Sequence, residues 1–191
     1  VKAPGTVIVS ASSQVDNVGK IVTSELKKVD NSKLIYVNLS GYADFSLGGS
    51  VLLQTKNELL AEPLKEVSVH SFKAAFSFVQ ELVKEEKLLA VHDISQGGAI
   101  VSALEMAFVG DLGLTLNLRN FPSSASLFSE QAGVLMQVSD KVLEEITNRA
   151  QDKFLDLKVV GDIGGKAVNL VTPEFTHRIE LEELRRVWMT P

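Results

Sequence analysis

The chain has 191 residues, of which 45% are hydrophobic and 23% are charged, and its formal net charge at pH 7 is −5. This composition is typical of a globular domain that is long enough to bury a core. An acidic balance without clustered Lys and Arg argues against a nucleic-acid-binding surface. The absence of cysteine excludes disulfides, thiolate catalysis and cysteine-ligated zinc.

No stretch approaches the roughly 18 consecutive apolar residues of a membrane span, and the first ten residues lack the pattern of a signal peptide. We therefore expect a soluble, cytoplasmic protein with neither membrane nor nucleic acid as a partner. No repeat or shift in composition divides the chain, which predicts one domain over residues 1–191. The three histidines are far apart, so a metal is expected either to be bound by carboxylates or to be absent.

The first half of the chain alternates between strand and helix patterns. The predicted elements are a short strand over Gly5–Ser12, a helix capped by Asp16 and ending near Leu26, a strand over Lys33–Leu39, a helix over Val51–Leu60 that is terminated by Pro63, and an amphipathic helix over Val69–Lys87. The strand Lys33–Leu39 is apolar throughout its centre, which is typical of a strand covered on both faces.

The second half continues in the same way. The predicted elements are a strand over Leu88–Val91, a buried helix over Gly98–Val109 stopped by Gly110, a strand over Gly113–Leu118, a loop over Asn120–Ser126, a strand over Val134–Val138, a helix from its cap Asp140 to Asp152, a β-hairpin of Leu157–Ile163 and Ala167–Val171, and a terminal helix over Ile179–Val187. The mixture predicts an α+β fold, layered as in α/β proteins, with a mixed sheet packed by helices.

The most informative stretch is His92-Asp93-Ile94-Ser95-Gln96-Gly97-Gly98, which joins a predicted strand to a helix. The first N–H groups of a helix lack partners within it and carry partial positive charge, and glycine lets an anion approach the backbone. Asp93, Ser95, Gly97 and Gly98 are therefore candidate phosphate-binding residues. The alternative is a tight connection in which Asp93 or Ser95 only caps the helix.

A second loop of similar composition, Ser46-Leu47-Gly48-Gly49-Ser50, follows the strand Lys33–Leu39. Its candidate phosphate donors are Ser46, Gly48, Gly49 and Ser50. Taken alone, the loop is equally consistent with an ordinary turn, because paired glycines are common in turns.

Two further side chains are candidates for chemistry. His92 is a candidate general acid–base, although nothing in the sequence identifies a partner for it. Glu130 lies among apolar and small residues, so it either pairs with a cation on burial or simply caps a helix in contact with solvent.

The segment His92–Gly98, followed by Ala103–Phe108 and a glycine-led strand, resembles the His-Asp-x-Ser-x-Gly-Gly signature of the C-terminal domain in the aminoimidazole ribonucleotide synthetase superfamily. That superfamily includes purine-biosynthetic synthetases, thiamine monophosphate kinase, selenophosphate synthetase and a hydrogenase-maturation dehydratase. Four further segments are similar to the phosphoribosylformylglycinamidine synthase family in its large, single-chain form: Ala3–Ala11, Ser46–Ser50, Leu127–Glu130 and Leu184–Thr190.

The resemblance implies the C-terminal domain fold of that superfamily and a place in a longer polypeptide, after a synthetase-like half and before a glutaminase domain. The whole enzyme would convert formylglycinamide ribonucleotide, ATP and glutamine to formylglycinamidine ribonucleotide, ADP, phosphate and glutamate. The chain on its own would be inactive, and an isolated copy could form a homodimer.

The resemblance also implies ATP and Mg²⁺ as cofactors, and Ser46–Ser50 as the grip on a ribonucleotide or nucleotide phosphate. Gln96 stands where the family usually has an acidic residue. Asp93 is then the better candidate for Mg²⁺, with Glu130 as a second. Two alternatives stay open: another superfamily member such as aminoimidazole ribonucleotide synthetase, or a structural module that holds a nucleotide without turning it over, which Gln96 favours.

Overall fold

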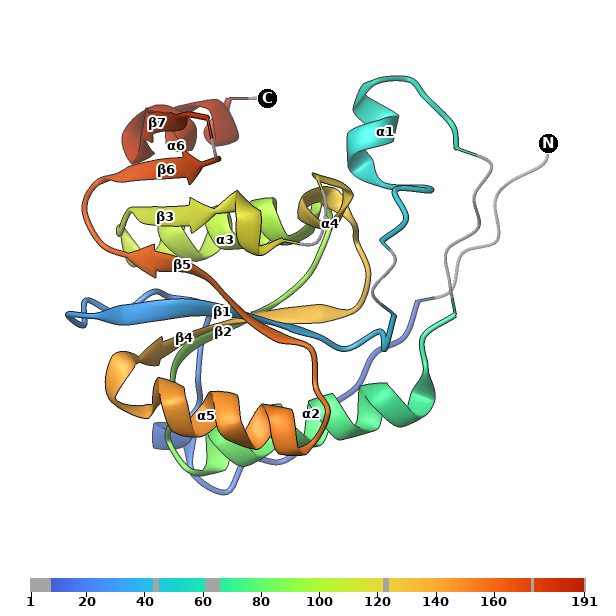
Figure 1. Cartoon of the computed structure of the whole chain (residues 1–191), viewed down its shortest axis with the longest axis vertical. Coiled ribbons are helices and arrows are strands. Elements are labelled where there is room, and N and C mark those ends of the chain that lie inside the picture. The colour runs from blue at the N-terminus through green and yellow to red at the C-terminus, as the bar shows by residue number, and fades with distance from the viewer. Residues whose placement is uncertain (1–7, 43–44, 61–65, 122–123, 173, 191) are drawn as a thin grey trace.

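A computed structural model describes residues 8–42, 45–60, 66–121, 124–172 and 174–190. Its centre is a seven-stranded sheet in the order β2-β4-β1-β5-β3-β6-β7 (Figure 1). The strands are β1 (Ser32–Asn38), β2 (Leu88–Asp93), β3 (Leu114–Asn117), β4 (Gly133–Ser139), β5 (Leu157–Ile163), β6 (Ala167–Val171) and β7 (Thr176–Glu180). Neighbouring strands are antiparallel except β3 and β6, which are parallel. The predicted α+β class with a mixed sheet is confirmed.

Helices cover both faces of this sheet. One layer holds α2 (Val69–Lys84) and α5 (Asp140–Asp152), and the other holds α3 (Gly98–Gly110), α4 (Ser124–Phe128) and α6 (Leu181–Met189). The short helix α1 (Val51–Thr55) lies beside α4, at the end of the sheet where β2 leads into α3 (Figure 1). None of the described helices has the length and apolar character needed to cross a bilayer.

The central strand β1 shows why the sheet needs two helical layers. Leu34 and Tyr36 lie in the core cluster under α3, whereas Ile35 and Val37 lie in the cluster under α2 and α5. Successive side chains of a strand point to opposite faces, so a continuous apolar run is buried only when both faces are covered. The prediction of a doubly covered strand is confirmed.

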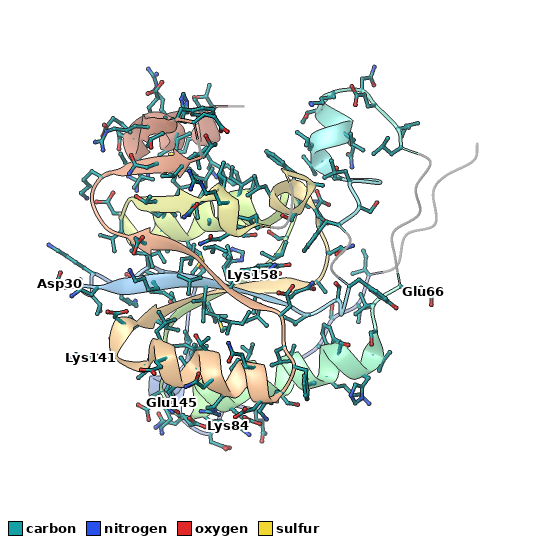
Figure 2. All side chains as sticks on the ribbon, in the orientation of Figure 1. Asp30, Glu66, Lys84, Lys141, Glu145 and Lys158 are labelled. Atoms are coloured by element: carbon teal, nitrogen blue, oxygen red, sulfur yellow. The ribbon has the colours of Figure 1, made fainter. Side chains whose placement is uncertain are left out.

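Ion pairs tie together the two helices of the α2–α5 layer. The guanidinium of Arg149 on α5 lies 2.7 Å from a carboxylate oxygen of Glu85 and 3.1 Å from one of Glu81. Figure 2 shows Lys84, Lys141 and Glu145 along the outer side of this layer. The charged residues of α2 and α5 therefore form the solvent face, and their apolar residues face the sheet.

The predicted helix from Asp16 to Leu26 is wrong. Only a 3₁₀ turn, η1 (Val18–Lys20), forms there, and the following residues run alongside the edge strand β2, where the Val91 N–H donates to the Thr23 carbonyl at 2.9 Å. An edge strand presents unpaired backbone groups, and an extended segment satisfies them better than a helix does. Of the predicted strand Gly5–Ser12, residues 5–7 lie outside the described ranges, and residues 8–12 form no strand.

Helix boundaries also differ from the predictions. The helix predicted over Val51–Leu60 ends at Thr55, because Asn57 adopts a left-handed φ of 58° that a helix cannot continue through. Pro63, predicted to end it, lies outside the described residues. Part of the predicted loop Asn120–Ser126 belongs to the short helix α4. Helix α5 is capped by the Ser139 hydroxyl and not by Asp140, which is its first residue.

The predicted hairpin of Leu157–Ile163 with Ala167–Val171 is wrong. Strand β3 lies between β5 and β6 and pairs with both. At the diglycine turn, Gly113 donates to the Gly165 carbonyl and accepts from the Gly164 N–H, both at 2.9 Å. These hydrogen bonds hold the diglycine turn next to the start of β3, so that β5 and β6 pair with opposite edges of β3. The following residues form β7, so the last helix begins at Leu181 and not at Ile179.

Candidate functional site

The two glycine loops identified in the sequence come together at one end of the sheet. Strand β2 ends at Asp93, which is paired with Val134 of β4, and β4 in turn brings Gly133 opposite Asn38 at the end of β1. The loop after β2 leads into α3, and the chain beyond β1 passes through Ser46–Ser50 into α1. The sequence-predicted sites are therefore neighbours in space.

In the His92–Gly98 loop, backbone shape explains both glycines. Gly97 and Gly98 have φ values of 87° and 78°, a left-handed conformation that is costly for any residue with a Cβ. A Cβ on Gly98 would also lie 2.6 Å from the Leu127 carbonyl oxygen and from backbone atoms of Phe128. Gly98 thus serves close packing of the start of α3 against the end of α4, whatever the loop binds.

The Ser46–Ser50 loop is a turn that leads directly into α1. The Gly48 N–H donates to the Ser46 hydroxyl at 3.1 Å, and the Ser50 N–H donates to the Leu47 carbonyl at 3.0 Å. The Ser50 hydroxyl then accepts from the Leu53 N–H as the N-cap of α1. Ser46 and Ser50 are buried. Both serines act here as acceptors for the chain itself.

Glu130 connects the two loops. Its Oε1 accepts the Gly97 N–H at 3.0 Å and the Val51 N–H at 2.8 Å. We call this pair of hydrogen bonds the Glu130 bridge. The sequence identified Glu130 as a candidate, but its two partners are 33 and 79 residues away, so no local pattern could reveal them.

The Glu130 bridge reduces the number of main-chain N–H groups in this region that are free to bind a ligand. The main-chain donors of Gly48, Ser50, Gly97 and Gly98 are all bonded within the protein. Within the described residues, the Gly49 N–H and the Ser95 hydroxyl make no hydrogen bond, and Gly49 is exposed. The polar groups that remain open to a phosphate are thus fewer than the sequence pattern predicts.

His92 has a partner that sequence reasoning missed. Its imidazole is 17% exposed, its Nε2 lies 3.3 Å from a carboxylate oxygen of Glu105 on α3, and its Nδ1 lies 2.6 Å from the Asp93 carbonyl oxygen. These contacts fix the plane of the ring at the end of β2. The available signal was Glu105 itself, the sole charged residue of an otherwise apolar helix.

The two carboxylates proposed for Mg²⁺ do not form a cation site. Oε1 of Glu130 already accepts two N–H groups, and the Asp93 side chain is 80% exposed. Gln96 is exposed and adds no acidic ligand. No group of three or more His, Asp or Glu side chains suited to a metal occurs in the described ranges. The donor set on the described part of this chain therefore does not fit Mg²⁺.

Tyr36 is a buried aromatic residue of β1 at this end of the sheet. A Cβ on Gly133 would lie 2.9 Å from the Tyr36 ring, which packs against Phe121 with ring centroids 6.3 Å apart. Burial raises the pKa of the Tyr36 phenol well above its ordinary value, and the Asp156 carboxylate raises it further. Tyr36 is therefore neutral over the physiological range.

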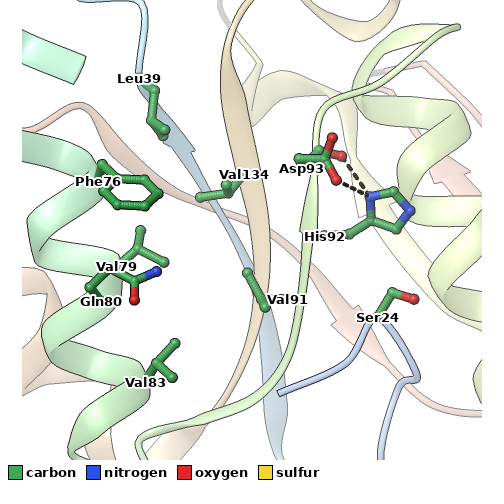
Figure 3. A pocket seen from close by; sticks show the side chains of 10 residues that line it. All are labelled: Ser24, Leu39, Phe76, Val79, Gln80, Val83, Val91, His92, Asp93 and Val134. Atoms are coloured by element: carbon green, nitrogen blue, oxygen red, sulfur yellow. Dashed lines mark hydrogen bonds and ion pairs between the residues drawn. The ribbon is translucent and has the colours of Figure 1, made fainter. Parts of the chain in front are cut away.

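A pocket of about 410 Å³ lies between α2 and the end of β2 (Figure 3). Phe76, Val79, Gln80 and Val83 of α2 form one wall, and Val91, His92 and Asp93 of β2 form the other. Its lining is mostly apolar, with the two polar residues of β2 at one end. His92 and Asp93 therefore border both this pocket and the glycine-loop region.

Residues 31–171 match the family described as AIR synthase related protein, C-terminal domain. The chain belongs to this family. The AIR synthase related C-terminal domain fold also occurs in Thermotoga maritima PurL complexed with ATP, with a TM-score of 0.69 at 15% identity over 87% of this chain and 27% of that one. The same protein complexed with FGAR gives a TM-score of 0.67 at 16% identity, over 87% of this chain and 30% of that one.

Curated relatives of this family member include two that align over 98% of the chain. The probable chloroplastic/mitochondrial phosphoribosylformylglycinamidine synthase of Arabidopsis thaliana is 32% identical, and the Homo sapiens phosphoribosylformylglycinamidine synthase is 31% identical. The chain spans only 14% and 15% of their lengths, respectively. The probable enzyme of Caenorhabditis elegans is 34% identical over 73% of the chain and 12% of its own length.

Proposed function

We propose that this chain is the C-terminal AIR-synthase-like domain of a phosphoribosylformylglycinamidine synthase. The observation that carries the proposal is the pair of alignments with the human and Arabidopsis enzymes, which run over 98% of this chain. A second support is the placement of both glycine loops at one end of the sheet, joined by the Glu130 bridge.

The whole enzyme would act as an ATP-dependent carbon–nitrogen ligase with glutamine as the amido donor. It would convert formylglycinamide ribonucleotide to formylglycinamidine ribonucleotide and release ADP, phosphate and glutamate. Phosphorylation by ATP turns an amide oxygen, a poor leaving group, into a good one. Such a reaction needs anionic reactants held in fixed positions, away from water. The preceding synthetase-like half and the following glutaminase domain would be its partners in the same polypeptide.

This chain would contribute binding and orientation. Its open polar groups at the loop end are the Gly49 N–H, the Ser95 hydroxyl and the exposed Asp93 carboxylate, and the His92 ring lies next to Asp93. Ser46, Gly48, Ser50, Gly97 and Gly98 would shape the two loops, since their own bonds are internal. No step is assigned to Mg²⁺ on this chain.

A second candidate function is a bracing module that holds the interdomain interface without turnover. The Glu130 bridge favours it, because a carboxylate occupies N–H groups that a phosphate would otherwise take. The exposed Gln96, in place of an acidic residue, points the same way.

The test uses the full-length polypeptide that contains this chain, assayed for formylglycinamidine ribonucleotide formation with ATP and glutamine. His92→Ala and Asp93→Asn are compared with Glu144→Ala, an exposed glutamate on α5. We expect each of the first two to lower kcat/KM by about 10-fold or more, with the control unaffected. Because the Asp93 side chain is 80% exposed, Asp93→Asn should do so at an unchanged melting temperature.

Full activity in both variants would favour the bracing module. A full-length protein without this activity would reject the assignment to the synthase. The predicted cytoplasmic location and the predicted homodimer of the isolated chain stay predictions.

A further inference from the structure

Glu130 is an acidic side chain that forms hydrogen bonds with two separate loops. It is half-buried and lies between the end of α4 and the start of β4. One carboxylate oxygen accepts two main-chain N–H groups, from the first residue of α1 and from the residue before α3. A carboxylate that accepts main-chain N–H groups makes stronger hydrogen bonds than a neutral acceptor.

The segment that carries Glu130 is itself firmly placed against α3. The Leu127 carbonyl and the Phe128 backbone lie so close to Gly98 that a Cβ there would be 2.6 Å away. The Ser129 N–H donates to the Ala125 carbonyl at 2.8 Å, which closes the last turn of α4. The backbone that leads to Glu130 is therefore held in place by α4 and by the start of α3.

Helix α1 has few other attachments. It contains five residues, and Leu53 is the one of them that is buried. A helix this short is not stable by itself, so its position depends on contacts with the rest of the protein. The bond from Val51 to Glu130 supplies such a contact at its first residue.

We infer that Glu130 is a positioning residue that couples the two glycine loops, so that the Ser46–Ser50 turn and the start of α3 hold one mutual arrangement. Its carboxylate takes the place of an external anion at the Gly97 and Val51 N–H groups. A ligand phosphate then meets the outer groups of the loops and not these two donors. The inference goes beyond the proposed function, because it concerns the geometry of this chain whatever reaction the whole enzyme performs.

The test follows individual amide protons by hydrogen exchange and by ¹⁵N chemical shift in the 191-residue chain. The variants are Glu130→Ala and Glu130→Gln, with Glu144→Ala as the matched control. In Glu130→Ala we expect the Gly97 and Val51 amides to exchange faster together, by about tenfold or more beyond the change that the loss of global stability produces at the amides of β1 and β4. Glu130→Gln, which keeps an acceptor oxygen without the charge, restores part of the protection at both amides.

Three results would overturn the inference: unchanged exchange at both amides, a change at only one of them, or a change at both that is no larger than the change at the amides of β1 and β4. A titration of the wild-type chain with ATP separates this inference from the proposed function. Loss of the hydrogen-bond correlation between the Gly97 and Val51 amides and the Glu130 carboxyl carbon on addition of ATP would mean that the ligand displaces the carboxylate, which contradicts the inference. Absence of any shift across the chain would count against nucleotide binding and leave the exchange result intact.

Discussion

The two glycine loops have similar compositions and different physical constraints. Gly98 is buried against the backbone of Leu127 and Phe128, whereas Gly49 is exposed with no atom within 4 Å of a Cβ built on it. Both have positive φ values, 78° and 73°. In the His92–Gly98 loop, glycine is required by packing as well as by backbone conformation. In the Ser46–Ser50 loop, backbone conformation alone requires it, and the surrounding space is open.

The largest effect is expected from Gly98→Ala. The added Cβ meets backbone atoms that cannot rotate away, and the left-handed φ adds its own strain, so we expect the free energy of unfolding to fall by about 3 kcal/mol or more. Urea denaturation of the purified chain measures this. A loss below about 1 kcal/mol would show that the start of α3 does not pack closely against the end of α4.

Removal of the bridging carboxylate comes next. Glu130→Ala leaves two N–H groups without their acceptor, and we expect a loss of about 2 kcal/mol in the free energy of unfolding. Glu130→Gln should lose less, since its amide oxygen still accepts. Equal losses in the two variants, measured by the same denaturation, would mean that the acceptor oxygen contributes nothing and that only the charge matters.

Gly49→Ala isolates the conformational cost in the open loop. With no neighbour to clash, only the left-handed φ is penalised, so we expect a loss of about 1 kcal/mol. The difference between this value and that of Gly98→Ala measures the packing contribution directly. The comparison between the loops fails if the two alanine variants are equally destabilised.

Ser129→Ala should be nearly neutral or slightly stabilising, by up to about 1 kcal/mol. The Ser129 hydroxyl is buried, and it has no hydrogen-bond partner among the described residues. It is adjacent to Glu130, so this variant is a control for the effect of altering the segment without breaking the bridge. A loss above 1 kcal/mol in thermal or urea denaturation would reveal a bond that the hydroxyl makes.

The smallest effect is expected far from both loops, in the ion pairs of the α2–α5 layer. Hydrogen bonds from Arg149 and Lys87 lower the pKa of Glu85 from 4.5 to about 2. A carboxyl with a lowered folded-state pKa stabilises the fold above its unfolded pKa and loses that contribution as the pH falls from about 4.5 towards 2. Because Glu85 is exposed, the change is small.

The acid effect is measured as the difference in melting temperature between wild type and Glu85→Gln. We expect wild type to melt higher at pH 6 and the difference to shrink by pH 3. A difference that does not change between these pH values would contradict the ion-pair account. The amides of the two glycine loops should show no response to the Glu85 substitution.

Much of the fold could be predicted from local patterns. The apolar run of β1, the 3.6-residue spacing of α2 and the small apolar residues of α3 are all local signals, and each element forms close to its predicted range. The wrong predictions concern segments whose structure depends on contacts with residues far away in the sequence. The segment before Leu26 is extended because it meets the edge of β2, and the predicted hairpin is split because β3 pairs between its strands.

Prediction of the candidate site from the sequence was limited in the same way, by contacts between residues of separate elements. Local pattern was sufficient to single out both glycine loops, because each follows an apolar strand, and Glu130, because it lies among apolar and small residues. His92 belongs to the first of these loops. Local pattern could not reveal that Glu130 bonds to Gly97 and Val51, or that His92 lies against Glu105. Those contacts join residues from separate elements, and only the packing of the sheet and α3 brings them together.

The central claim is that one carboxylate holds both loops, and a long-range HNCO spectrum tests it most directly. That experiment correlates an amide nitrogen with the carbon of the group that accepts its hydrogen bond. The Gly97 and Val51 amides should both correlate with the side-chain carboxyl carbon of Glu130. Correlations from these two amides to different acceptors, or to none, would contradict the account.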